Sequence, residues 1–269
     1  MRSIRFVLPA IGLVSALSAL SALSACKSES PPEPARRDPS SVDAAASDKP
    51  TGTALGFDVA GGRRPPPPAP HTVTPSPDDP KHGIWTLSDA TAGLPAEAGA
   101  DLLATITTTD GTLVCKLYAD KAPTTVANFA GLARGLRPFK DSTTGTWVTR
   151  PAYDGTTFHR IIKGFMIQGC DPTGTGGGEQ GYVIADELWG GKHDRAGLMC
   201  MANRGADTNG AQFFITDDAA AHLDKGYTIF GECKPEAVVH AIAQVPTGPG
   251  DRPLKTVTMK TVKITRGVF

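Results

Sequence analysis

Apolar and polar residues alternate along two neighbouring stretches, 102–108 and 112–118, which are also rich in β-branched side chains. Successive side chains of a strand point to opposite faces of a sheet, so a period of two predicts a strand in each stretch. Asp110-Gly111 lies between the stretches and is typical of a tight turn. The pattern therefore predicts a β-hairpin at the start of a folded domain.

The pattern then changes to helical spacing. Pro123 is suited to the first turn of a helix, because the amide that proline lacks would have no partner there. We expect the helix to end near Gly135. The apolar positions predicted to form its buried face are Val126, Phe129, Ala130, Ala133 and Leu136.

Short strand-like runs fill most of the remaining chain. They cover 158–162, 165–168, 197–202, 212–216, 227–231 and 254–264, and a second short helix follows Pro235. Many short strands with only two helices favour a closed antiparallel β-barrel. The fold class predicted is therefore mainly β.

Two of these runs carry an unusual set of functional groups. Arg160, Phe165, Met166 and Gln168 fall within nine residues, in a run that reads FHRIIKGFMIQGCD. A second run, MANRGADTNGAQFFI, begins at Met201. An arginine among large apolar residues is costly to bury without a partner. Taken alone, the first run is equally compatible with a core strand pair that has a solvated arginine.

The two runs together resemble those of a cyclophilin-type peptidyl-prolyl cis-trans isomerase. The first matches the family's FHRxIxGFMxQGGD motif with Cys170 in place of the second glycine of its GG pair, and the second matches throughout. The resemblance covers about residue 103 to the C-terminus. It implies an eight-stranded barrel capped by two helices, and an enzyme that rotates X-Pro bonds in proline-containing polypeptides without a cofactor or a metal.

The resemblance also assigns roles to residues. Arg160 would be the catalytic donor, and Gln168 would support it and touch the substrate. The residues implied to bind substrate are Phe165, Met166, Gly174, Ala202, Asn203, Gln212, Phe214, His222, Leu223 and Tyr227.

Three positions depart from the pattern of many members. His222 stands where they have tryptophan, which predicts weak cyclosporin binding because an indole N–H donor is lost. Tyr227 stands where they have histidine and keeps an aromatic body with a polar tip. Arg204 is larger than the usual residue and could bias which residues are accepted before proline.

The chain begins with the layout of an export signal. Residues 1–25 have a basic start and an apolar run, and the run ends Leu-Ser-Ala-Cys, which is similar to a bacterial lipobox. We expect cleavage before Cys26, acylation of that cysteine, and anchoring in the cell envelope, with the outer membrane favoured over the inner. The alternative is an ordinary signal peptide with a chance cysteine.

Residues 26–97 are predicted to be a disordered tether, because the stretch 27–95 holds 14 of the 23 prolines and shows no sustained period. Ile84 and Trp85 could mark a part that docks on the domain. The isomerase domain is expected over 98–269, with 137–153 as an insertion of unknown role.

Charge and short motifs exclude several other functions. Lys+Arg and Asp+Glu both total 27, which argues against a nucleic-acid partner. Gly176, Gly178 and Gly181 match a dinucleotide fingerprint, but a strand pattern follows where a helix is needed. The histidines lack the short sequence spacings that are typical of metal ligands, and His159 is expected to be a packed core residue.

We expect the protein to be a monomer.

Four cysteines remain after Cys26, and an even number in an exported protein permits disulfides. By the topology of the resembling family, Cys115 with Cys233 and Cys170 with Cys200 are the pairings to consider. Two other functions stay open beside the enzyme: a proline-peptide binding module or chaperone without turnover, and a structural envelope lipoprotein.

Overall fold

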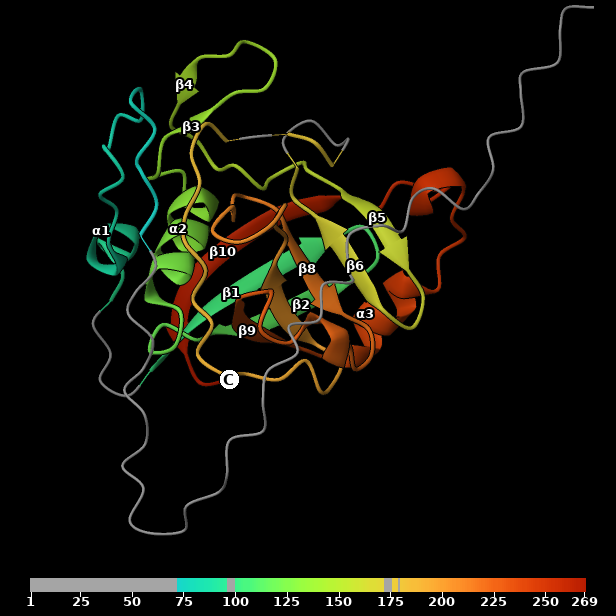
Figure 1. Cartoon of the computed structure of the whole chain (residues 1–269). Coiled ribbons are helices and arrows are strands. Elements are labelled where there is room, and N and C mark those ends of the chain that lie inside the picture. The colour runs from blue at the N-terminus through green and yellow to red at the C-terminus, as the bar shows by residue number, and fades with distance from the viewer. Residues whose placement is uncertain (1–71, 96–99, 172–175, 179) are drawn as a thin grey trace, which may run out of the picture. The chain divides into compact units, whose positions relative to one another are not determined.

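The fold is an antiparallel eight-stranded sheet that curls into a half-barrel (Figure 1). The computed structural model describes residues 72–95, 100–171, 176–178 and 180–269. Along the sheet the strands follow the order β10-β1-β2-β9-β7-β8-β6-β5. They are β1 (Asp101–Thr108), β2 (Thr112–Leu117), β5 (Phe158–Ile162), β6 (Met166–Gly169), β7 (Leu198–Met201), β8 (Phe213–Thr216), β9 (Ile229–Lys234) and β10 (Met259–Gly267).

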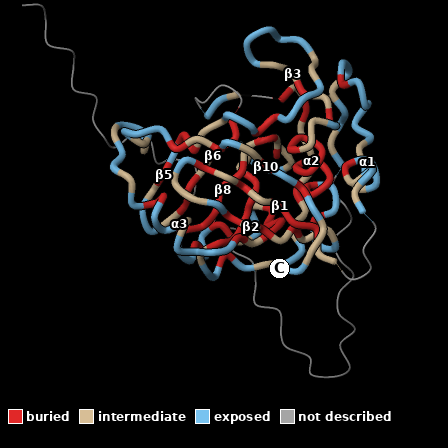
Figure 2. Tube along the Cα trace, turned by 180° about the vertical axis from the view of Figure 1, so that it is seen from behind, coloured by how far each residue is buried: buried red, intermediate tan, exposed pale blue. Residues whose placement is uncertain are grey.

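The helices α2 (Pro123–Ala133) and α3 (Glu236–Ala243) lie at opposite ends of the half-barrel. Val126 and Phe129 of α2 and Val239 and Ile242 of α3 join the inward side chains of the strands in one apolar core. Figure 2 shows that buried residues concentrate along α2 and the central strands. Both predicted helices and the period-two strands are therefore confirmed.

The predicted closure of the barrel is wrong. Strands β5 and β10 are the two ends of the sheet, and the residues that precede them share only the isolated bridge Thr157–Thr258. The prediction began the last strand at residue 254, whereas β10 begins at Met259. Residues 254–258, which would have to pair with β5, form a loop. Three backbone hydrogen bonds join the two ends there: Phe158 N to Val257 O at 3.0 Å, and Met259 N to Thr156 O and Gly155 N to Met259 O, both at 2.8 Å.

The buried stripe of α2 is shorter than predicted, since Leu136 is 37% exposed. The helix ends at Ala133, and Gly135 takes a left-handed φ of 67°. This turn carries the chain off the helical path before Leu136, so helical spacing no longer places that side chain against the core.

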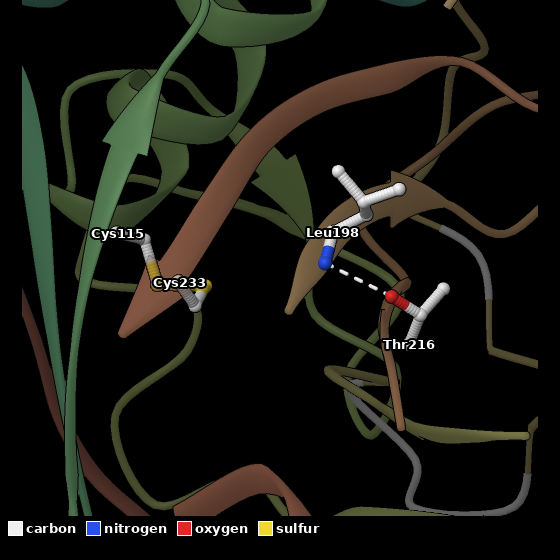
Figure 3. The surroundings of a disulfide bond; sticks show 4 residues. All are labelled: Cys115, Leu198, Thr216 and Cys233. Atoms are coloured by element: carbon white, nitrogen blue, oxygen red, sulfur yellow. Dashed lines mark hydrogen bonds between the residues drawn. A yellow bond between two sulfur atoms is a disulfide. The ribbon is translucent and has the colours of Figure 1, made fainter. Parts of the chain in front are cut away.

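A disulfide joins Cys115 of β2 to Cys233 of β9 (Figure 3). The two residues are direct partners in the β2–β9 ladder, which brings their side chains together on one face. Of the two pairings left open by the sequence, this one is present, whereas Cys170 and Cys200 are free and buried. Figure 3 also shows the Leu198 N–H of β7 donating to Thr216 Oγ1 of β8 at 2.9 Å.

Replacing both Cys115 and Cys233 by serine is expected to lower the free energy of unfolding by about 2–4 kcal/mol. The bridge joins residues separated by 118 positions, and its loss frees that long loop in the unfolded chain. Urea unfolding of the oxidised protein and the double variant measures the difference, and the reduced wild-type protein should match the variant. A variant as stable as the oxidised protein would contradict the prediction.

The segment that precedes β1 packs on the folded domain, although it lies before the predicted domain boundary at residue 98. Helix α1 (Leu87–Thr91) begins with a capping box formed by Thr86 and Asp89, and it packs against α2. Trp85 Nε1 donates to the Ala127 carbonyl of α2 at 2.9 Å, whereas Ile84 is 72% exposed. Residues 26–71 and 96–97 of the predicted tether lie outside the described residues, as does the signal segment 1–25.

A buried ion pair anchors this segment. Asp79 is 0% exposed and Arg137 is 2% exposed, and the guanidinium donates from Nη1 to Oδ1 at 3.0 Å and from Nη2 to Oδ2 at 2.7 Å. The guanidinium also lies over the Tyr182 ring, 4.1 Å from its centroid. The backbone N–H groups of Lys81 and Gly83 donate to the same carboxylate. Asp79 is thus fully hydrogen-bonded, as a buried charge must be.

The insertion 137–153 contains a hairpin that sequence reasoning missed, formed by β3 (Phe139–Lys140) and β4 (Trp147–Val148). Trp147 stacks on Tyr182 with ring centroids 6.4 Å apart. Lys140 of the hairpin pairs with Asp78, so the hairpin packs beside the docked N-terminal segment. Among the residues that the structure describes, no helix is long and apolar enough to cross a membrane.

Candidate functional site

The register of the sheet places the functional groups of the two motifs in one row. Arg160 on β5 is paired with Gln168 on β6, and Gln168 is paired with Phe214 on β8. Cross-strand partners stand side by side on the same face. Met166 shares that face with Gln168, because the two are separated by two positions on β6. Segments about fifty residues apart in sequence thus form one surface.

This surface lines a pocket of about 200 Å³. Its walls are formed by nine residues, all of which the resemblance assigns to the site: Arg160, Phe165, Met166, Gln168, Ala202, Asn203, Phe214, Leu223 and Tyr227. The pocket combines one guanidinium and two amides with an apolar interior. It is suited to a small apolar ring next to a polar backbone.

The floor of the pocket is a small second core on the outer face of the sheet. Met166, Phe214 and Leu223 are nearly buried, at 2%, 4% and 7% exposed. Phe165 and Tyr227 pack against this cluster, and the Tyr227 ring meets the Phe214 ring edge to face with centroids 5.8 Å apart. These contacts hold the aromatic walls before any ligand enters.

His222 lies at the rim instead of in the wall. It belongs to the 3₁₀ helix η1 (Ala221–Leu223), is exposed, and rests on the Phe165 ring with centroids 5.2 Å apart. The departure from tryptophan at this position therefore changes the edge of the pocket and leaves its floor intact.

Arg160 is half-exposed, and its Nε donates to Asp251 Oδ2 at 3.2 Å. Asp251 is the final residue of the 3₁₀ helix η2 (Pro249–Asp251). Sequence reasoning missed Asp251, and no local signal connects it with Arg160, since the two residues are 91 positions apart.

Gln168 is held by a chain of side-chain amides. Its Nε2 donates to Gln212 Oε1 at 3.2 Å, and Gln212 Nε2 donates to the Gly176 carbonyl at 3.0 Å. The expected support of Arg160 by Gln168 is thus replaced by a bond to Gln212, although Arg160 and Gln168 are neighbours in the ladder. Gly174 of the same glycine-rich loop lies outside the described residues.

Both polar atoms of the Asn203 side-chain amide are hydrogen-bonded. Its Nδ2 donates to the Gly226 carbonyl at 2.9 Å, and its Oδ1 accepts from the Gly205 N–H at 3.3 Å. The preceding Ala202 N–H donates to the Gln212 carbonyl at 3.0 Å. The stretch 202–203 is therefore a rigid edge of the pocket.

A larger hollow of about 390 Å³ continues from the pocket, with Gln168, Ala202 and Asn203 in both linings. Gln212 and Arg204 line this second hollow. Thr74 and Ser76 of the N-terminal segment and Lys140 of the hairpin also line it, and the sequence reasoning did not foresee these three. Because they share Gln168, Ala202 and Asn203, the two hollows form one groove.

Two groups near the site are kept neutral by burial. Burial lowers the pKa of His159, which points away from Arg160 into the interior, as predicted for a packed histidine. Burial also raises the pKa of the Cys200 thiol, which lies beside Phe214 in the ladder. A protonated buried thiol is a poor nucleophile, so Cys200 serves the packing of the floor.

Comparisons with known proteins agree with this geometry. The family described as "Cyclophilin type peptidyl-prolyl cis-trans isomerase/CLD" matches residues 103–264. Peptidyl-prolyl cis-trans isomerase A of Mycobacterium tuberculosis is 44% identical over 169 residues, which cover 61% of this chain and 93% of that protein. Peptidyl-prolyl cis-trans isomerase B of Streptomyces anulatus is 46% identical over 172 residues, covering 61% and 96%.

A solved structure shows the same fold. It is a cyclophilin type peptidyl-prolyl cis-trans isomerase of Cryptosporidium parvum, determined in the presence of the dipeptide ala-pro. The sequence identity is 32% and the TM-score is 0.52, over 60% of this chain and 98% of that one. The motifs, the half-barrel, the pocket and these relatives lead to one conclusion: the chain belongs to the cyclophilin-type peptidyl-prolyl cis-trans isomerases.

Proposed function

We propose that the pocket holds the proline ring of a polypeptide and that Arg160 accelerates rotation of the preceding peptide bond. The single observation that carries this proposal is the pocket itself, in which Arg160 and Gln168 meet the apolar floor of Met166 and Phe214. The structure determined in the presence of ala-pro supports the same class of ligand.

The chemistry follows from the electronic structure of the X-Pro bond. Its rotation barrier of about 20 kcal/mol comes largely from amide resonance. As the bond rotates, the prolyl nitrogen loses conjugation and regains a lone pair, so a hydrogen-bond donor aimed at it acts only in the transition state. Arginine cannot be deprotonated in a protein, so Arg160 donates without transferring a proton.

One donor is not sufficient for the whole effect. A hydrogen bond to a charged group contributes about 1.5–3 kcal/mol, whereas a million-fold acceleration requires about 8 kcal/mol. The floor and the fixed Ala202–Asn203 edge supply the remainder by orienting the peptide and by excluding water from the rotating bond. Exchange spectroscopy on an Ala-Pro peptide tests the activity directly.

The rim residue His222 sets the response to cyclosporin. Wild-type protein is expected to bind the drug weakly, and His222→Trp is expected to tighten binding about three- to tenfold, because it restores the indole N–H donor that the family pattern has at this position. Inhibitor titration of both proteins measures this. Ala221→Trp is the control, since it adds an indole to the same exposed turn at a neighbouring position. Unchanged affinity in His222→Trp would contradict the assignment.

We further propose that the enzyme works as a monomer in the bacterial cell envelope, on exported proteins during folding. The lipobox-like signal before Cys26 supports export and anchoring. The Cys115–Cys233 disulfide supports an oxidising compartment, where such bonds persist.

Acylation at Cys26 has a direct test. Full-length protein expressed in a Gram-negative host should fractionate with membranes and resist an alkaline wash, because two or three acyl chains give stable anchoring. Cys26→Ser should be found in the soluble fraction with unchanged isomerase activity. If the variant stays with the membranes as well, the anchor is not at Cys26.

A further inference from the structure

The loop between α3 and β10 is built to hold one residue against β5. Its two arms are joined by hydrogen bonds from Gly248 N to Arg252 O and from Leu254 N to Pro246 O, both 2.8 Å. The helix η2 forms the tip between these arms and contacts β5. The tip therefore has a fixed position beside the strand that carries Arg160.

At this tip Asp251 accepts the hydrogen bond from Arg160 Nε described above, at 3.2 Å. Both side chains are 44% exposed, so the pair lies at the open edge of the pocket. A guanidinium has one Nε and two terminal amino groups. Since the carboxylate takes Nε, the terminal groups stay available for a substrate.

The side chain expected to hold Arg160 has a different partner, because Gln168 Nε2 donates to Gln212. We propose that Asp251 is the positioning residue of this enzyme: its carboxylate fixes the plane of the Arg160 guanidinium before the peptide binds. The inference rests on the proposed function, in which Arg160 is the donor to the prolyl nitrogen.

Fixing the guanidinium matters because catalysis needs the donor in place when the bond rotates. A free arginine samples many rotamers and loses that freedom at the moment of reaction. A carboxylate bond made in the resting enzyme removes this cost beforehand, which is the meaning of electrostatic preorganisation. The effect should therefore fall on kcat and spare substrate binding.

The backbone at the tip allows a clean test. Asp251 has a left-handed φ of 58°, and Gly250 beside it has a φ of 70°. Alanine would strain this conformation, whereas glycine and asparagine tolerate it. Asp251→Gly thus removes the carboxylate and keeps the loop, and Asp251→Asn keeps a neutral acceptor in the same place.

The experiment measures kcat and KM of the full-length protein for an Ala-Pro peptide. We expect Asp251→Gly to lower kcat about three- to tenfold with KM within about twofold, the size of effect expected from one lost charge-assisted hydrogen bond. Asp251→Asn should fall between Asp251→Gly and wild type. Asp101→Ala is the matched control: it breaks the comparably exposed Lys116–Asp101 pair of β1 and β2 and should change neither constant.

The same substitution in an Arg160→Ala background separates two failures. If Asp251 acts through Arg160, Asp251→Gly has no further effect there. If Arg160→Ala is inactive but Asp251→Gly keeps wild-type kcat, or raises it, the positioning role is wrong and the proposed function stands. If Arg160→Ala itself keeps full activity, the proposed role of Arg160 is wrong, and the positioning role of Asp251 is wrong with it.

Discussion

Arg160→Ala is expected to lower kcat about 10- to 100-fold while KM stays within about twofold of wild type. The loss corresponds to one hydrogen bond of about 1.5–3 kcal/mol that forms only in the transition state, and tenfold in rate is about 1.4 kcal/mol. Removing an interaction that is absent from the ground state lowers kcat and leaves KM unchanged. Exchange spectroscopy at several peptide concentrations gives both constants.

Two further variants make this result specific. Arg160→Lys keeps the charge but loses the planar fork, so its kcat should lie between those of wild type and Arg160→Ala. Lys163→Ala removes a neighbouring exposed cation from the β5–β6 turn and should leave kcat unchanged. A fall in kcat for Lys163→Ala equal to that of Arg160→Ala would show that general positive charge, not the guanidinium at the pocket, is what matters.

Asp79→Ala is expected to lower the free energy of unfolding by about 3–5 kcal/mol, because it leaves the guanidinium of Arg137 buried without its partner. The loss should be visible in urea or thermal unfolding. Asp78→Ala is the matched control: Asp78 is the neighbouring carboxylate and pairs with Lys140, but it is exposed, so its loss should matter far less. Equal effects of the two substitutions would contradict an anchoring role for Asp79.

The Asp79–Arg137 ion pair also makes the free energy of unfolding depend on pH, and the sign of this dependence can be derived. Burial by itself would raise the pKa of Asp79, but hydrogen bonds from Arg137 and from the Lys81 and Gly83 amides outweigh it, so the pKa lies below 3.8. A carboxyl whose pKa is lower in the folded state stabilises the fold above pH 3.8, and this stabilisation disappears as the pH falls through the lowered value. Wild-type protein should lose this contribution on acidification, whereas Asp79→Ala should not show it.

The docked N-terminal segment reaches from this anchor to the substrate groove. Asp79 fixes the turn that follows Thr74 and Ser76, and these two residues line the second hollow beside Lys140. The family match begins at residue 103, so part of the groove wall comes from chain outside the matched domain. The activity of this enzyme should therefore be measured on protein that retains residues 72–95.

Much of the site could be predicted from the sequence because its signals are local. The alternation along 165–168 predicts that Met166 and Gln168 share a face, and the resemblance of the first motif implies that Arg160 and Gln168 belong to one site. The two motifs contain seven of the nine pocket residues, and the other two, Leu223 and Tyr227, follow the second motif within twelve positions of its end. Strand period and side-chain chemistry need no long-range information.

Other features were decided only by the tertiary structure. The choice of Cys115 with Cys233 depends on which strands become neighbours, and the open edge between β5 and β10 depends on where β10 begins. The docking of Asp79 on Arg137 joins residues 58 positions apart, and Asp251 reaches Arg160 across 91. Each of these features depends on segments that are far apart in sequence and share no period or motif, so only the folded chain decides them.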